Sequence, residues 1–254
     1  MQFYNGGFTA RYGDKMSSAL EVKYLAEKSD RISGILRADL LNMGLSLKGS
    51  FGNFNWKTGF RLAYPAMFLQ NLQTQGDYKP SFSDIQFLGN YSISPYDQIE
   101  TFILYSVNKY DLSPKEWVGN FQTSRLDIEQ INIDQSGEKN YSFNTNLAAL
   151  KYIKTFGKSS LSISISKYFS KEYEKSNVIG NVYYSPDAEN PDTNKEFLFT
   201  CTEHIDDKAS LSSYNLQAEI NTSYRDHNLI SGLEYKNILL THLTQTDDKI
   251  KKKV

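Results

Sequence analysis

The sequence predicts an all-β protein, more narrowly an antiparallel up-and-down transmembrane β-barrel of which this chain holds part, about nine strands. Three observations predict it. Apolar and polar residues alternate with a period of two. Short and long connections alternate strictly from Phe51 onward, and aromatic residues make up 14% of the chain. Such an aromatic content is not typical of a disordered chain. With 28 Lys and Arg against 29 Asp and Glu, the charges nearly cancel, so there is no basic footprint for nucleic acid.

The predicted strands come in two groups. The alternation is cleanest over Phe54–Tyr64, Asp84–Ile93, Gln98–Asn108 and Tyr214–Tyr224. It is weaker over Arg31–Leu40, Met43–Gly49, Tyr141–Ile153, Ser160–Phe169 and Leu229–Leu239. Strands of soluble proteins usually have about 5–6 residues, whereas a tilted strand that crosses a bilayer needs about 9–11. The lengths of the cleanest segments therefore favour a membrane.

The connections between these strands alternate in length. Short ones, with turn-forming Gly, Pro, Asp or Asn, are predicted at Phe51–Asn53, Ser94–Asp97, Thr155–Lys158 and Arg225–Asn228. Long ones are predicted at Pro65–Ser81, Tyr110–Asn140 and Lys171–Ser213. Outer-membrane barrels have this order because their periplasmic turns are short and their extracellular loops are long.

Charged residues stand inside the predicted membrane strands, on the face opposite the apolar one. They are Lys57, Arg61, Asp84, Glu100 and Glu219. A Lys or Arg that faces lipid at the midplane costs about 2–4 kcal/mol. These side chains are therefore expected to line a polar interior.

Nine strands do not close the even-numbered barrel expected of a single bacterial chain, and an open edge in hydrocarbon leaves backbone groups unsatisfied. The sequence is therefore expected to be a piece of a longer protein. The residues after Met1 also lack the basic and apolar regions of a signal peptide.

One segment near the N-terminus resembles a known family. Gly6–Lys23, with Ala10-Arg11-Tyr12-Gly13 ahead of Ser17-Ser18, resembles the end of the plug domain in TonB-dependent outer-membrane receptors, in the form found in Bacteroidetes. Gly76–Gln86 is similar to an early segment of such barrels. The resemblance implies that residues 1–28 are the C-terminal end of a plug domain and residues 29–254 the N-terminal portion of a transmembrane β-barrel.

The family takes up scarce nutrients, such as siderophore complexes, cobalamin or glycans, through a plugged barrel. The resemblance implies a receptor in the outer membrane that is not an enzyme and needs no cofactor. Its expected partners are outer-membrane lipid, the TonB complex through an N-terminal segment absent from this sequence, and a surface lipoprotein.

Five residues are candidate ligand contacts. Trp117, in a predicted long connection, either stacks on a sugar or chelator or anchors its loop. The others, Lys57, Arg61, Asp84 and Glu100, stand on the predicted lumen face, where Lys57 and Arg61 are expected to meet plug carboxylates.

The stretch from Cys201 to Asp207 holds Cys, Glu, His and Asp side chains. No second Cys or His follows at a structural-zinc spacing, so a solvated loop without a metal is expected. No catalytic triad can be argued from three scattered histidines.

Two alternatives remain open at this point. A soluble β-sandwich that binds a ligand or carbohydrate would give the same alternation and would fold without detergent. A complete small barrel of eight or ten strands, serving as an adhesin or structural pore, would have a signal peptide just upstream.

Overall fold

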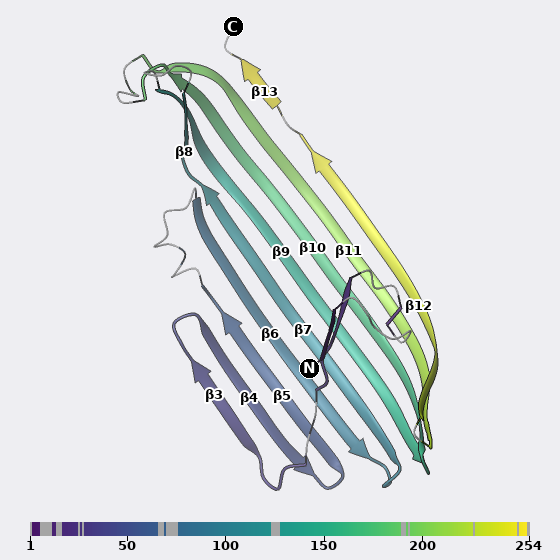
Figure 1. Cartoon of the computed structure of the whole chain (residues 1–254). Coiled ribbons are helices and arrows are strands. Elements are labelled where there is room, and N and C mark those ends of the chain that lie inside the picture. The colour runs from purple at the N-terminus through teal and green to yellow at the C-terminus, as the bar shows by residue number, and fades with distance from the viewer. Residues whose placement is uncertain are drawn as a thin grey trace.

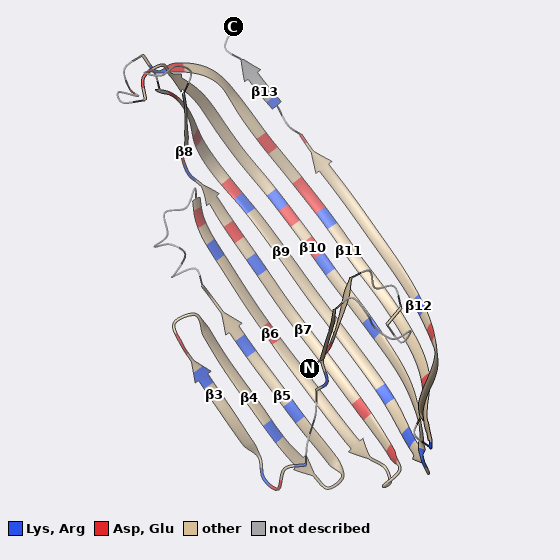
Figure 2. Ribbon diagram, in the orientation of Figure 1, with Lys and Arg blue, Asp and Glu red and all other residues tan. Residues whose placement is uncertain are grey.

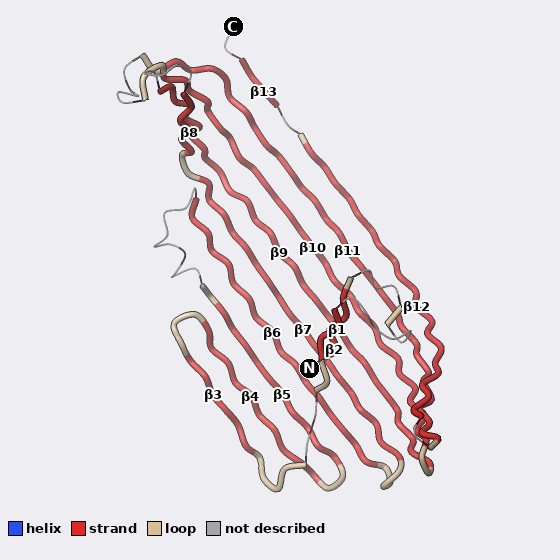
Figure 3. The backbone as a smooth tube through the Cα atoms, in the orientation of Figure 1, coloured by secondary structure: helices blue, strands red, loops and turns tan. Residues whose placement is uncertain are grey.

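The computed structural model describes residues 2–5, 12–13, 17–24, 26, 28–65, 69, 76–122, 128–188, 192, 194–225, 227–247 and 249–252. Over these residues the protein is all-β, as predicted (Figure 3). β1 (Gln2–Asn5) and β2 (Ser18–Glu21) form a small antiparallel sheet of their own. Every other strand belongs to one antiparallel sheet of 11 strands, a single tilted layer (Figure 1).

The large sheet is ordered β12-β11-β10-β9-β7-β6-β5-β4-β3, with β8 beside β9 and β13 beside β11. Its strands are β3 (Ser33–Ala38), β4 (Asn42–Phe51), β5 (Phe54–Ala63), β6 (Gly76–Ser92), β7 (Asp97–Pro114), β8 (Trp117–Gln122), β9 (Ile128–Phe156), β10 (Ser159–Ser185), β11 (Glu196–Tyr224), β12 (His227–Thr246) and β13 (Lys249–Lys252). All nine predicted strands are present, as β3 to β7 and β9 to β12, whereas β8 and β13 were not predicted.

The predicted short connections are confirmed, and glycine explains two of them. Gly52, between β4 and β5, has φ +57°, and Gly157, between β9 and β10, has φ +58°. Glycine, which has no Cβ, adopts this backbone at little cost. The link from Ser94 to Asp97 is closed differently, because Ser94 Oγ accepts hydrogen bonds from the backbone N–H groups of Tyr96 and Asp97, both at 3.1 Å.

The prediction of three long connections is wrong in extent. Most of Tyr110–Asn140 and of Lys171–Ser213 is strand, because β7, β9, β10 and β11 continue far beyond the apolar alternation. In Pro65–Ser81 the strand β6 already begins at Gly76. The ladder is held by backbone hydrogen bonds, which do not require apolar side chains. β9, at 29 residues, is about three times the length that a tilted strand needs to cross a bilayer.

The pairing register divides the side chains between two faces, since successive residues of a strand point to opposite sides. One row of paired residues runs Gly44, Arg61, Asp84, Ser106, Thr145, Ser170, Leu211, Leu240 across the sheet. We call this side the Arg61 face. The opposite side carries Trp56 and is called the Trp56 face.

Near the short turns, the Trp56 face is an apolar belt. All nine strands of the main path contribute exposed large hydrophobic side chains to it: Leu36, Met43, Leu45, Phe51, Phe60, Ile85, Tyr91, Ile103, Tyr105, Leu150, Ile163, Ile165, Tyr214, Leu216, Ile220, Leu229, Leu233, Tyr235 and Leu239. Leu233 is the most exposed of them, at 82%. The hydrophobic residues that are buried in the described structure are Ala19, Ala63, Val178 and Val182.

No second sheet packs on the belt within the described residues, so the arrangement differs from the sandwich alternative, in which two sheets share a core. In the same part of the chain the sheet is open: β3 and β12, its two edge strands, each pair on one side. None of the described residues belongs to a helix long and apolar enough to cross a membrane.

Candidate functional site on the Arg61 face

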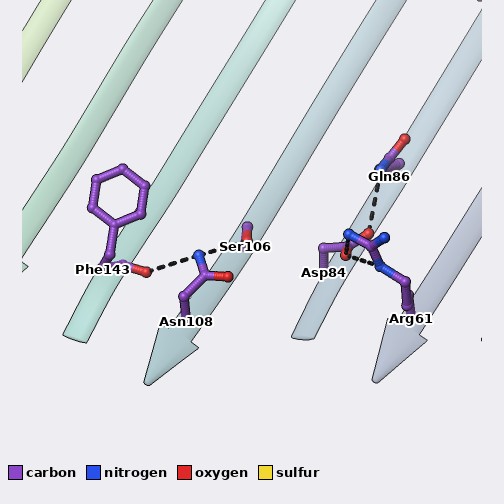
Figure 4. Close-up of polar contacts among 6 residues, drawn as sticks. All are labelled: Arg61, Asp84, Gln86, Ser106, Asn108 and Phe143. Atoms are coloured by element: carbon purple, nitrogen blue, oxygen red, sulfur yellow. Dashed lines mark hydrogen bonds and ion pairs between the residues drawn. The ribbon is translucent and has the colours of Figure 1, made fainter. Parts of the chain in front are cut away.

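The Arg61 face carries an ion pair between adjacent strands. Arg61 in β5 and Asp84 in β6 are directly paired in the register, so their side chains stand side by side. Nε and Nη2 of Arg61 each lie 2.7 Å from Oδ2 of Asp84, and Gln86 Nε2 donates to Oδ1 at 3.2 Å (Figure 4). Asp84 is 7% exposed whereas the Arg61 side chain is 63% exposed. The carboxylate is thus held in place, and the guanidinium presents its outer edge to the face.

A hollow of about 430 Å³ surrounds this pair. Among the described residues, Arg37, Lys57 and Arg61 line it with positive charge, and Asp84 contributes one carboxylate. The hollow is therefore basic on balance. Lys and Arg also occur along the strands of both halves of the sheet (Figure 2), but here three of them face one space.

An aromatic side chain from outside the large sheet borders this hollow. Tyr24, in the segment between β2 and β3, stacks on Phe102 of β7 with ring centroids 5.1 Å apart and an angle of 21° between the rings. Phe102 stands on the Arg61 face, in register with Leu88. Tyr24 therefore lies over the Arg61 face and not over the apolar belt.

The structure brings three of the five candidate residues together. Lys57, Arg61 and Asp84 line the hollow, and the partner of Arg61 is a strand carboxylate, Asp84, where the sequence led us to expect carboxylates of the plug segment. Glu100 lies on the same face, one row nearer the short turns than Lys57 and Phe102. It is paired in register with Asn90 and Lys151.

Trp117 lies elsewhere and is not in a loop. It begins β8 and pairs with Ile133 of β9, whereas the row of Asp84 meets β9 at Thr145. At about 3.4 Å per residue, some 40 Å of strand separates the two positions. Trp117 therefore does not share the hollow with the other candidates.

A second polar cluster stands farther along the Arg61 face. Oε1 of Glu203 in β11 accepts hydrogen bonds from Lys139 Nζ at 2.6 Å and Ser176 Oγ at 2.5 Å. Burial alone would raise the pKa of Glu203, but the two hydrogen bonds and the positive charge of Lys139 outweigh it and lower that pKa. Ser176 is fully buried. The cluster joins β9, β10 and β11 and stabilises the extension of the sheet.

The stretch from Cys201 to Asp207 is strand, not the expected loop. Its residues alternate between faces, so Glu203 and His204 point to opposite sides of the sheet. His204 Nδ1 lies 2.5 Å from Asn177 Oδ1 on the Trp56 face. Among the described side chains, no group of three His, Cys, Asp or Glu is placed to hold a metal ion.

Sequence reasoning missed Tyr24, Phe102, Gln86 and Arg37 as parts of the hollow. Arg37 and Gln86 stand on the polar face of their strands, but only the register shows that they meet the same space. Tyr24 precedes the first strand of the large sheet, where no alternation indicates an orientation. The hollow suits a ligand or chain segment with an acidic group and a flat apolar part, because cations and aromatic rings border it together.

No protein-family model matches this chain, and no curated protein or solved structure matches it.

Proposed function

We propose that this chain is the end of a plug and the first strands of the barrel of a TonB-dependent outer-membrane receptor, non-enzymatic, which takes up a scarce nutrient of the siderophore, cobalamin or glycan type. The observation that carries the membrane part is the apolar belt. Its large side chains are exposed on every strand of the main path. The other face is more polar at the same level, where Asp84 and Gln86 stand, although Ile35, Phe82, Ile238 and Leu240 are exposed on it.

The energetics favour lipid as the neighbour of this belt. Monomeric soluble proteins rarely expose apolar patches larger than a few hundred Å², and each Å² of apolar surface left in water forgoes about 25 cal/mol. An outward apolar band about 25 Å tall, on strands whose other face is polar, is the pattern of transmembrane barrels.

The open edges set a requirement. Unpaired backbone groups of β3 and β12 would be costly in hydrocarbon. Closure of the sheet by further strands is therefore part of the proposal, as is the assignment of the Arg61 face to the lumen.

The stacking of Tyr24 on Phe102 supports the assignment of residues 1–28 to a plug. A plug lies inside the barrel, and the Arg61 face is the inside in this proposal. The hollow beside Tyr24 then lies on the path of the ligand. Lys57, Arg61 and Asp84 are the proposed contacts there, with Glu100 below them and Trp117 near the outer end.

The two tryptophans of the chain test the membrane placement. Trp56 stands on the Trp56 face beside the belt residues of β5, whereas Trp117 pairs with Ile133 far beyond the belt and on the Arg61 face. Two single-tryptophan variants, Trp117→Phe and Trp56→Phe, are made in the complete, closed barrel that the proposal requires, with any tryptophan outside these residues replaced by Phe. They are refolded into phosphatidylcholine vesicles with and without bromine on the acyl chains. The complete barrel is also used in the other vesicle experiments, because the open edges of β3 and β12 oppose insertion of this chain alone.

The brominated lipid is expected to quench most of the emission of Trp117→Phe, which retains Trp56, and little of that of Trp56→Phe. Equal quenching of the two variants, or none in either, would contradict the proposal.

A further inference from the structure

Four lysines stand on the Trp56 face farther from the short turns than the last belt residue of their own strand. Lys109 comes two positions after Val107 in β7, and Lys167 and Lys171 follow Ile165 in β10. Lys208 of β11 shares a transverse row with Lys109, through Ser142 and Tyr173. We call Lys109, Lys167, Lys171 and Lys208 the lysine band.

No acidic side chain shares this face between the row of Lys167 and the row of Lys208, all of whose paired residues are described. The first acids, Asp111 and Asp206, stand one row farther from the belt. Asp206 Oδ1 is 3.0 Å from Lys208 Nζ, so one of the four charges is partly balanced. The band carries a net positive charge.

The other border of the belt differs. There, beside the short turns, Lys154 Nζ lies 3.7 Å from Oδ1 of Asp97 on the same face, so a cation and an anion stand together. Beside the same turns, Lys158 follows β9, and Arg225 follows β11 with its guanidinium 5.4 Å from the ring centroid of Tyr224. Cations therefore stand at both borders of the belt, but beside the turns an acidic residue of the same face, Asp97, accompanies them.

Three lysines of the band lie over aromatic rings of the same face. Their Nζ atoms are 5.0 Å from the ring centroid of Tyr214 for Lys167, 5.5 Å from that of Phe169 for Lys171, and 5.3 Å from that of Tyr173 for Lys208. Rings and ammonium groups of this kind suit the border between hydrocarbon and headgroups, where one side is apolar and the other wet.

We propose that the lysine band binds the phosphate groups of anionic lipid headgroups in the leaflet on the side away from the short turns. The inference rests on the proposed membrane placement of the belt, because only a bilayer around the belt brings headgroups to this row. A lysine ammonium presents three donors to phosphate oxygens. Each lysine near an anionic surface contributes about 1 kcal/mol, which corresponds to about a fivefold preference for anionic over neutral lipid.

The test measures which lipid surrounds the band. Phe169→Trp, made together with Trp56→Phe and Trp117→Phe, places one reporter between Lys167 and Lys171 and keeps a ring under Lys171. The variant is inserted into mixed phosphatidylcholine and phosphatidylglycerol vesicles in which only one of the two lipids carries bromine. The ratio of quenching by the two lipids gives the preference for the anionic one.

We expect a preference for phosphatidylglycerol of about fivefold or more at position 169. Lys167→Gln with Lys171→Gln should reduce it nearly to one. Lys151→Gln, on the Arg61 face of the neighbouring strand β9, should leave it unchanged. A reporter at Trp56 itself, in Trp117→Phe, should show no preference, because no lysine of the band stands on β5.

The experiment separates a failure of the lysine band from a failure of the membrane placement. Quenching by both lipids without any preference at position 169 would overturn the lysine band while leaving the membrane placement intact. A preference that survives the two Lys→Gln changes would overturn it as well. Absence of quenching by either lipid at both reporter positions would overturn the membrane placement, and the lysine band with it.

Discussion

The two halves of strands β9, β10 and β11 have the same backbone and different surroundings. Near the short turns their Trp56 face is apolar, with Leu150, Ile165 and Leu216 exposed. Farther along the same face stand Asn140, Lys175 and Asp206, again in one row. Regular pairing continues through both halves. The ladder therefore sets the period of two, whereas the composition of one face decides what that face contacts.

We expect the largest difference in the free energy of unfolding when a charge is placed in one half of β11 or in the other. Leu216→Arg puts a guanidinium into the belt and should lower the free energy of unfolding in vesicles by about 2–4 kcal/mol. Ser210→Arg, on the same face beyond the belt, should cost about 0–1 kcal/mol, as near an interface. Gln217→Arg, on the Arg61 face beside Leu216, is the second control. Guanidinium titration measures all three, and equal costs at Leu216 and Ser210 would remove the distinction between the halves.

The ion pair on the Arg61 face should give the next effect. Arg61→Met leaves the 7% exposed carboxylate of Asp84 with Gln86 as its remaining side-chain donor. A buried acceptor that loses a partner costs about 1–3 kcal/mol. Lys57→Met, two positions along the same strand face, should change the free energy of unfolding by less than about 0.5 kcal/mol.

Joining Arg61→Met to Asp84→Leu should recover part of that loss, since the unpaired charge is removed. If the double variant is less stable than Arg61→Met, the pair is not what stabilises this region.

The smallest expected effect concerns pH at the turn before β7. Hydrogen bonds from Tyr152 (2.6 Å) and Ser94 (2.7 Å) lower the pKa of Asp97 below 3.8. A lowered pKa in the folded state adds stability that is complete above pH 3.8 and is lost as the pH falls through the lower folded value. Denaturant titrations at neutral and acidic pH should show a smaller acid loss for Asp97→Asn than for the unmodified chain. An identical loss would mean that Asp97 is not responsible.

The sequence predicts the strands well where one face is apolar. Alternation such as Phe54, Trp56, Phe60 located β5, and the turn residues located its ends. The same reasoning failed over Lys171–Lys175, where charged and polar residues occupy both faces and the hydrophobic period disappears. Pairing there rests on the backbone ladder and on contacts such as Lys139 with Glu203, which join residues distant in sequence.

The sequence predicted several residues of the candidate site, but it did not predict that they come together. Arg61 and Asp84 were placed on the polar face, yet their contact depends on the register of β5 and β6, which the period does not fix. The position of Tyr24 at the hollow was not predicted, because its segment has no alternation of apolar and polar residues. Trp117 was assigned to a loop because the polar surroundings of β8 hide its pairing with β9.

Nitroxide scanning along β11 tests whether the Trp56 face meets lipid at the belt and water beyond it. In a Cys201→Ser chain inserted into vesicles, single cysteines replace each residue from Tyr214 to Glu219 and from Thr202 to Asp207. We predict that oxygen accessibility alternates with a period of two over the first stretch, high at Tyr214, Leu216 and Ala218, while a water-soluble nickel chelate reaches both faces of the second. Chelate access at Leu216 equal to that at Asp206 would contradict the account.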